Sequence, residues 1–147
     1  MTTVWHVLNV KGKEVWTVGP DQTVLEALEL MAEKNIGAVL VLENDKIVGI
    51  FSERDFARFS AKRGALSLYT PVSELMTQAV YYVSPDQSTD ECMALMSQKH
   101  IRHLPVMEKG KLVGLISIND VVREVISEKE ITIHSLENYI MGREYNQ

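Results

Sequence analysis

A serine and an aspartate three residues apart occur twice in this chain, each time at the end of an apolar run. The pairs are Ser52 with Asp55 and Ser117 with Asp120. A serine that precedes a helix adds a hydroxyl to the unpaired N–H groups and positive dipole of the helix N-terminus, where an anion is favoured. An aspartate one turn later offers two acceptor oxygens, which suit the vicinal diol of a ribose. Phosphate beside ribose indicates a nucleotide.

The same spacing has a simpler interpretation. Ser-x-x-Asp is also a variant capping box, in which the two side chains serve only to start a helix. Because helix caps are common and nucleotide sites are rare, the spacing alone favours the cap by about two to one. Gly49 and Gly114, just ahead of the motifs, also have two interpretations: they either allow a ligand to approach the backbone or mark a β-bulge.

Basic residues near the two motifs favour the nucleotide interpretation. Arg54 lies inside the first motif, and Arg102 and His103 precede the second, where the first copy has Gly37 and Ala38. Cations directed at one cleft would suit a phosphate chain. The alternative for Arg102 and His103 is a solvated strand end.

Both motifs belong to a long internal repeat. Residues 18–58 align without a gap with residues 83–123, and 17 of the 41 aligned positions are identical. A fixed period of this kind indicates a duplicated structural unit. The 147 residues correspond to about one domain, so we expect two half-domains that share one core.

Each repeat has the signals of two helices. Thr23 with Glu26, and Ser88 with Glu91, are capping boxes that predict a helix start. Residues 35–37, which include an asparagine and a glycine, predict the end of the first of these helices. A second helix is expected to follow each Ser-x-x-Asp motif directly.

Each repeat also has the signals of three strands. Residues 14–18 and 79–83 are rich in β-formers and predict short strands. Two apolar runs around a polar turn predict a β-hairpin over residues 38–51 and another over residues 104–116. Pro105 lacks a backbone donor, so we expect it near a strand start or on a sheet edge.

The order strand, helix, strand, strand, helix therefore occurs twice. It predicts an α/β (α+β) fold with a small mixed sheet and both helices on one side. A short amphipathic helix is expected over residues 2–9, with a similar piece at residues 72–76. After Ser127 an amphipathic pattern continues outside the repeats, and it has an apolar face to bury against the chain's own core or a partner subunit.

The net charge and several short sequence features disfavour some classes of function. A net charge of −5 disfavours bulk nucleic-acid binding. No apolar run approaches a membrane span and no signal peptide is evident, so we expect a cytoplasmic protein without membrane contact. Cys92 fits a buried small hydrophobe better than a nucleophile, and His100-x-x-His103 lacks the further ligands of a metal site.

Three patterns follow in order in each copy, the third in full in both and the first two with substitutions in one copy each: P-D-x-T-x-x-E-A-L-x-x-M, I-x-x-L-P-V, and K-x-V-G-x-h-S-x-x-D, where h is apolar. Over residues 2–127 they resemble a tandem pair of CBS domains, named after cystathionine β-synthase and also called a Bateman module. The resemblance is greatest to small stand-alone bacterial proteins. It implies two motifs about a pseudo-two-fold axis, with two clefts that bind adenine nucleotides such as AMP, ADP, ATP or NAD. S-adenosylmethionine is the less favoured ligand.

The resemblance also implies roles for individual residues. Asp55 and Asp120 would bind ribose, Ser52 and Ser117 phosphate, and the segments before each hairpin would line the adenine or supply charge. Because Gly37-Ala38 lacks the basic pair of the second copy, the two sites are expected to differ in affinity or ligand. The predicted nucleotide-binding residues are Ser52, Arg54, Asp55, Ser117, Asn119, Asp120, Arg102, His103, Ile36, Gly37, Ala38, Ile101 and Pro105.

We predict a first CBS motif over residues 2–63, a linker over 64–71, a second motif over 72–127 and a helical extension over 128–147. The predicted function is a non-catalytic sensor of energy state that binds an adenine nucleotide, forms a homodimer and signals to an effector protein. A ligand-independent interaction or dimerisation module is the alternative. Catalysis is not expected, because the sequence has no P-loop and no G-x-S-x-G elbow and nothing places Ser, His and Asp as a triad.

Overall fold

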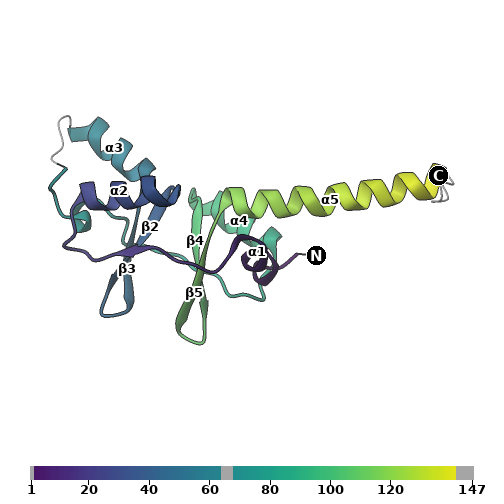
Figure 1. The fold of residues 1–147 in the computed structure, drawn as a ribbon, viewed down its shortest axis with the longest axis horizontal. Helices are drawn as coiled ribbons and strands as arrows, with labels where there is room; N and C mark the ends of the chain where they lie inside the picture. The colour runs from purple at the N-terminus through teal and green to yellow at the C-terminus, as the bar shows by residue number, and fades with distance from the viewer. Residues whose placement is uncertain (1, 64–67, 142–147) are drawn as a thin grey trace. The chain divides into compact units, whose positions relative to one another are not determined.

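The computed structural model describes residues 2–63 and 68–141 of the chain. These residues form helices, short strands and two small sheets, which confirms the predicted mixed α/β class (Figure 1). Residues 64–67 of the predicted linker and 142–147 of the predicted extension lie outside the described residues.

The chain folds as two compact units. The first-repeat unit comprises residues 14–81, and the second-repeat unit combines residues 1–13 with residues 82–147. The N-terminal segment therefore packs with the second repeat, although in sequence it leads into the first. Conversely, the segment that leads into the second repeat packs with the first.

In the first-repeat unit, a three-stranded sheet carries two helices. Its elements are β1 (Thr17–Val18), α2 (Val24–Lys34), β2 (Ala38–Glu43), β3 (Lys46–Ser52), α3 (Glu53–Arg63) and the 3-10 helix η1 (Val72–Glu74). Strand β2 is central, parallel to β1 and antiparallel to β3. Val39 and Phe51 lie opposite each other and share one apolar cluster with Met31 of α2 and with Phe56 and Phe59 of α3. Both helices therefore lie on one side of the sheet, as predicted.

The second-repeat unit repeats this arrangement with a two-stranded sheet. Its elements are α1 (Val4–Lys11), α4 (Thr89–Lys99), β4 (His103–Glu108), β5 (Lys111–Ser117) and α5 (Ile118–Met141). Leu104, Ile116 and Met96 form its core together with Val121 of α5, and α1 adds its buried apolar stripe, including Leu8, to the same cluster. The predicted N-terminal helix is thus confirmed, and its apolar face is buried in this unit.

The helices α2 and α4 begin at the predicted caps. The hydroxyl of Thr23 accepts the N–H of Glu26 at 3.1 Å, and the hydroxyl of Ser88 accepts the N–H of Glu91 at 3.1 Å. Each glutamate carboxylate, however, accepts from the preceding glutamine, Gln22 or Gln87, at 3.0 Å. The helix starts are therefore confirmed, whereas the glutamate half of each capping box is replaced by this bond.

The predicted strand at residues 79–83 is wrong for most of its length. Only Val83 pairs, through an isolated parallel bridge to Val106. Its N–H donates to Pro105 at 3.0 Å and its carbonyl accepts from Met107 at 2.8 Å. Pro105 has no N–H for the next bond on this edge of β4. In the first repeat Leu40 occupies the aligned position, and there a two-residue strand forms.

The two hairpins are confirmed, and their glycines have a structural role. The turn residues Asn44 and Asp45 both have positive φ, as do Lys109 and Gly110 in the second hairpin, which is the geometry of tight two-residue hairpin turns. The strand register shifts by one residue beside each of the two strand glycines, Gly49 and Gly114. The bulge interpretation of these glycines is therefore supported.

The backbone at both glycines is approached closely by the protein itself. A Cβ at Gly49 would lie 2.5 Å from the sulfur of Met76, and one at Gly114 would lie 2.5 Å from Cδ2 of Leu8. These side chains, rather than a ligand, fill the space that the missing Cβ leaves. Leu8 belongs to α1, which precedes the first repeat in sequence but packs in the second-repeat unit, beside Gly114. Met76 follows η1, which precedes the second repeat but packs in the first-repeat unit, beside Gly49.

The C-terminal extension is not a separate helix. Helix α5 runs without a break from Ile118 to Met141, so the second-repeat helix and the predicted extension are one element (Figure 1). Beyond Val125 its large apolar side chains are at least half exposed in the described residues; they are Ile126, Ile131, Ile133, Leu136, Tyr139 and Ile140. The face that the sequence predicts for burial is thus open within this chain.

Candidate functional site at the two Ser-x-x-Asp turns

Each Ser-x-x-Asp motif joins a strand directly to a helix. In the first turn the carboxylate of Asp55 accepts the N–H of Ser52 at 2.9 Å, and the Ser52 hydroxyl accepts the N–H of Asp55 at 3.1 Å. In the second turn the corresponding distances between Ser117 and Asp120 are 2.8 and 3.2 Å. Both motifs are therefore reciprocal capping boxes, so the predicted capping role is confirmed.

The structure brings the predicted segments before each hairpin to these turns. Glu53 donates its N–H to the carbonyl of Gly37 at 3.1 Å, and Ile118 donates its N–H to the carbonyl of Arg102 at 2.8 Å. Ala38 pairs across the sheet with Ser52, and His103 with Ser117. In each unit the residues predicted from the two ends of the hairpin therefore lie side by side.

These bonds leave fewer backbone donors for an anion than the sequence argument assumes. In the second turn the N–H groups of Ser117, Ile118 and Asp120 all have protein acceptors. The same three positions are satisfied in the first turn. An anion at either helix start would depend on side-chain cations more than on backbone N–H groups.

A threonine hydroxyl completes the surroundings of Asp55. Thr77 donates its hydroxyl to Oδ1 at 3.2 Å, while Oδ2 also accepts the hydroxyl of Ser52 at 3.0 Å. Thr77 reaches this position because its backbone pairs with Ile50 of β3 through two hydrogen bonds. The group that contacts Asp55 from outside its own turn is therefore a neutral hydroxyl.

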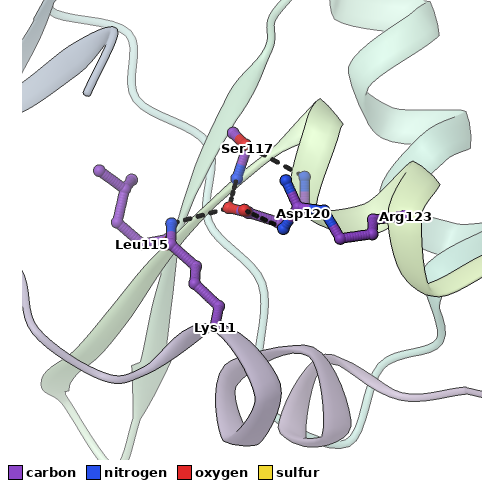
Figure 2. Close-up of polar contacts among 5 residues, drawn as sticks. All are labelled: Lys11, Leu115, Ser117, Asp120 and Arg123. Atoms are coloured by element: carbon purple, nitrogen blue, oxygen red, sulfur yellow. Dashed lines mark hydrogen bonds and ion pairs between the residues drawn. The ribbon is translucent and has the colours of Figure 1, made fainter. Parts of the chain in front are cut away.

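Lysine occupies the corresponding place beside Asp120 (Figure 2). The Nζ of Lys11 lies 2.7 Å from Oδ2 of Asp120 and also donates to the carbonyl of Leu115. Arg123 lies 3.7 Å from Oδ1, but its side chain is 64% exposed, so screening weakens its contribution. Asp120 is itself only 8% exposed. The second turn therefore holds a nearly buried ion pair that the first turn lacks.

The pKa of Asp120 reflects this environment. Burial alone would raise the pKa of the carboxyl, because desolvation disfavours its charged form. The hydrogen bonds from Lys11 and Ser117, together with the charge of Lys11, outweigh burial and lower the pKa below the ordinary aspartate value. Asp120 is consequently ionised at neutral pH.

Sequence reasoning did not identify Lys11 and Thr77 as site residues. The recurrence of the apolar piece at residues 2–9 and 72–76 indicates that their segments are related. It does not indicate that each segment crosses to the other repeat, which is what brings these two side chains to the aspartates. A lysine next to a helix-ending glycine, Gly12, gives no local signal of a binding role.

The other predicted site residues differ in their surroundings. Ile36 and Ile101 pack against the apolar cores of their units. Pro105 is buried within β4. Arg102 and Asn119 are exposed at the second turn, while Arg54 and His103 are partly buried.

Other side chains that could in principle react, such as Cys92 and His100, have structural roles. Cys92 is buried, and desolvation, with a smaller contribution from Glu91, raises the pKa of its thiol to about 11, so the thiol stays protonated. His100 ends α4 in the left-handed conformation, which fixes it as a helix terminator. Within residues 2–63 and 68–141 there is no group of three or more His, Cys, Asp or Glu side chains positioned for a metal ion. In the same residues, no helix has both the length and the apolar character to cross a bilayer.

Comparison with known proteins agrees with this architecture. The family model of the CBS domain matches residues 8–62 and again residues 72–127. A mitochondrial CBS domain-containing protein of Arabidopsis thaliana, CBSX3, is 34% identical over 151 residues, covering 96% of this chain and 73% of its own length.

Solved structures share both the fold and the sequence pattern. A candidate signal-transduction protein with CBS domains from Burkholderia ambifaria MC40-6 is 50% identical, with a TM-score of 0.81 over 86% of this chain and 95% of its own. The CBS domain pair of protein MJ0100, in complex with 5′-methylthioadenosine and S-adenosyl-L-methionine, is 25% identical, with a TM-score of 0.74 over 84% of this chain and 99% of its own. CBS pairs are regulatory or signal-transduction modules, and some bind adenosine-containing ligands. This chain belongs to the CBS-domain family and consists of two CBS domains in tandem, followed by the distal part of a long C-terminal helix.

Proposed function

We propose that this protein is a non-catalytic regulatory module that binds an adenine nucleotide, AMP, ADP, ATP or NAD, at its Ser-x-x-Asp turns and signals occupancy to a partner. The observation that carries the proposal is that both capping aspartates keep acceptor capacity beyond their capping bonds. An ionised carboxylate has about four acceptor positions. Asp55 uses three, for Ser52 N–H, Ser52 hydroxyl and Thr77 hydroxyl, and Asp120 uses two, for Ser117 N–H and Lys11.

A ribose could use this remaining capacity. A vicinal diol donates two hydrogen bonds to one carboxylate, and the hydroxyl of Thr77 is free to rotate away from Asp55 because its backbone is held separately by Ile50. The helix cap would stay intact, since it uses Oδ2 of Asp55 and the diol would approach Oδ1. Starting the helix and binding a ligand are therefore compatible.

Cations near the turns favour a phosphorylated ligand. Arg54 lies at the first turn, and Arg102 and His103 lie at the second, where the N–H of Ile118 donates to the carbonyl of Arg102. Guanidinium groups bind phosphate through charge-assisted hydrogen bonds. The adenosine part of the ligand is supported by the complex of the MJ0100 pair with two adenosine compounds. S-adenosylmethionine stays the less favoured ligand here, because the basic residues suit an anion.

Isothermal titration calorimetry with AMP, ADP, ATP, NAD and S-adenosylmethionine tests the proposal. We expect at least one adenine nucleotide to bind, and Asp55→Ala and Asp120→Ala each to remove binding at one turn. Thr23→Ala is the matched control, because it removes a helix cap of the same kind far from either aspartate in sequence, and it should leave affinity unchanged. No binding by the wild type, or equal weakening by Thr23→Ala, contradicts the proposal.

Signalling requires that the ligand binds one conformation better than another. Helix α5 begins at Ile118, inside the second Ser-x-x-Asp turn, and continues to an exposed apolar face, so it offers a rigid path from that turn to a partner. We propose that this partner is either a second copy of the chain, forming a homodimer, or an effector protein. Steady turnover of ATP by the pure protein would contradict the non-catalytic assignment.

The exposed face of α5 also supports a second candidate, a ligand-independent interaction module. Both aspartates already have a structural role as caps, and Ile133, Leu136 and Ile140 remain open to solvent. A chain ending at Ser127 should then lose self-association or partner binding, as measured by light scattering during gel filtration. If nucleotide changes the association state of the full chain, the sensor is favoured; if it never does, the ligand-independent module is favoured.

A further inference from the structure

The two aspartates differ in the charge of the side chain that contacts them from outside the turn. At Asp55 it is the hydroxyl of Thr77, and at Asp120 it is the ammonium of Lys11. Lys11 is the last residue of α1, and Gly12 with φ of 108° ends the helix behind it. Its ammonium uses two of its three donors, on Asp120 and on the carbonyl of Leu115 (Figure 2). One donor is therefore left for a further acceptor.

A bound diol would share the carboxylate of Asp120 with the ammonium of Lys11. Oδ2 of Asp120 already accepts from Lys11 and from the N–H of Ser117. Ribose hydroxyls on Oδ1 of Asp120 would draw on the charge of the same carboxylate and so weaken the ion pair on Oδ2, and the side chain of Lys11 is only 28% exposed. A partly buried ammonium whose ion pair is weakened is less stable unless a further acceptor reaches it.

A ligand that carries its own anion supplies that acceptor. The flexible four-carbon stem of lysine allows the ammonium to turn from the carboxylate toward a phosphate of the same ligand. Adenosine or 5′-methylthioadenosine offers no such group. At the Asp55 turn this difference does not arise, because Thr77 carries no charge.

We propose that Lys11 makes the Asp120 turn selective for adenosine compounds that carry negative charge, whereas the Asp55 turn also accepts uncharged ones. This inference rests on the proposed function. It concerns Lys11 separately from Arg102, His103 and Arg123, because these three side chains stay in place when Lys11 alone is changed.

The test measures the affinities of AMP and adenosine by calorimetry in an Asp55→Asn background, which retains an acceptor oxygen for the cap. We expect AMP to bind more tightly than adenosine, and Lys11→Thr to reduce that ratio by about tenfold, the size of one charge-assisted hydrogen bond. Lys11→Arg keeps the charge and should preserve the preference for AMP. Thermal unfolding followed by circular dichroism confirms that each variant is folded.

The reciprocal exchange keeps the inference testable if Lys11→Thr does not fold. In an Asp120→Asn background, Thr77→Lys should raise the AMP to adenosine affinity ratio of the first turn by a similar factor. Ratios that both exchanges leave unchanged within twofold overturn the inference while the proposed function stands. If the wild type binds none of AMP, ADP, ATP and NAD, the proposed function and the inference both fail.

Discussion

The turns at Ser52 and Ser117 have the same motif and the same capping bonds, but they differ in what surrounds the aspartate. Asp55 is half-buried beside a neutral hydroxyl, and Asp120 is almost fully buried beside an ammonium. The capping bonds come from within the repeat, so duplication has kept them alike. The additional group beside each aspartate, the Thr77 hydroxyl or the Lys11 ammonium, comes from a segment outside the aligned repeats, where the two halves have diverged.

This comparison indicates where specificity can change without loss of the fold. Substitution of Lys11 or Thr77 alters the charge at an aspartate but leaves the strand, the cap and the helix start intact. Substitution of either serine or aspartate alters the helix start itself. In this molecule the residues that distinguish the two turns are therefore separable from the residues that build them.

The largest effect should come from removing the two aspartates in turn. Asp120→Ala removes a cap and leaves Lys11 partly buried without its partner, so we expect a loss of about 2–4 kcal/mol in the free energy of unfolding. Asp55→Ala removes a cap and an exposed hydroxyl contact, so about 1 kcal/mol is expected.

The two tryptophans allow each unit to be measured separately. Trp5 lies in the second-repeat unit and Trp16 in the first, so Trp16→Phe and Trp5→Phe backgrounds report urea unfolding of one unit each by fluorescence. Thr23→Ala and Ser88→Ala, which remove one equivalent cap in each unit, should cost similar amounts and serve as controls. Equal losses for Asp55→Ala and Asp120→Ala would mean that the Lys11 ion pair contributes no net stability.

A smaller effect is expected from pH. The pKa of Asp120 is lower in the folded protein than in the unfolded chain, where it is about 3.9. Its contribution to stability is therefore complete above that value and is lost as pH falls through the lower folded pKa. Urea unfolding of the second-repeat unit between pH 6 and pH 2.5 should show this loss.

The control for the pH prediction is Asp120→Asn, which cannot titrate at this position. It should be less stable than wild type at pH 6, and the difference should shrink as the pH falls below about 4. A difference that stays constant over this range would show that the ion pair with Lys11 does not lower the pKa of Asp120.

The parts of the structure that the sequence predicts are those with local signals. Helix starts at Thr23 and Ser88, the two hairpins and the caps at both Ser-x-x-Asp motifs follow from a few adjacent residues. The strand before the second repeat fails because its pairing depends on Pro105, which lies more than twenty residues later. Lys11 and Thr77 could not be predicted, because each lies in a segment that precedes one repeat in sequence but packs with the other, and no sequence pattern indicates this.

The most specific prediction concerns the two strand glycines. Gly114→Ala places a methyl 2.5 Å from Cδ2 of Leu8, a fully buried branched side chain, so overpacking should cost about 1–3 kcal/mol. Gly49→Ala meets the sulfur of Met76 at the same distance; the unbranched thioether can move aside, but the backbone carbonyl of Thr77 lies 3.1 Å from the new methyl, so a cost in the same range is expected. Leu8→Ala leaves room for the new methyl, and the Leu8→Ala, Gly114→Ala double variant should therefore lose less stability than the sum of the single variants. Additive losses would mean that Leu8 and Gly114 are not coupled.

Leu8 and Lys11 both belong to α1, so a displaced Leu8 should also weaken the ion pair between Lys11 and Asp120. Gly114→Ala should therefore reduce the discrimination between AMP and adenosine at the second turn, and Gly49→Ala should not.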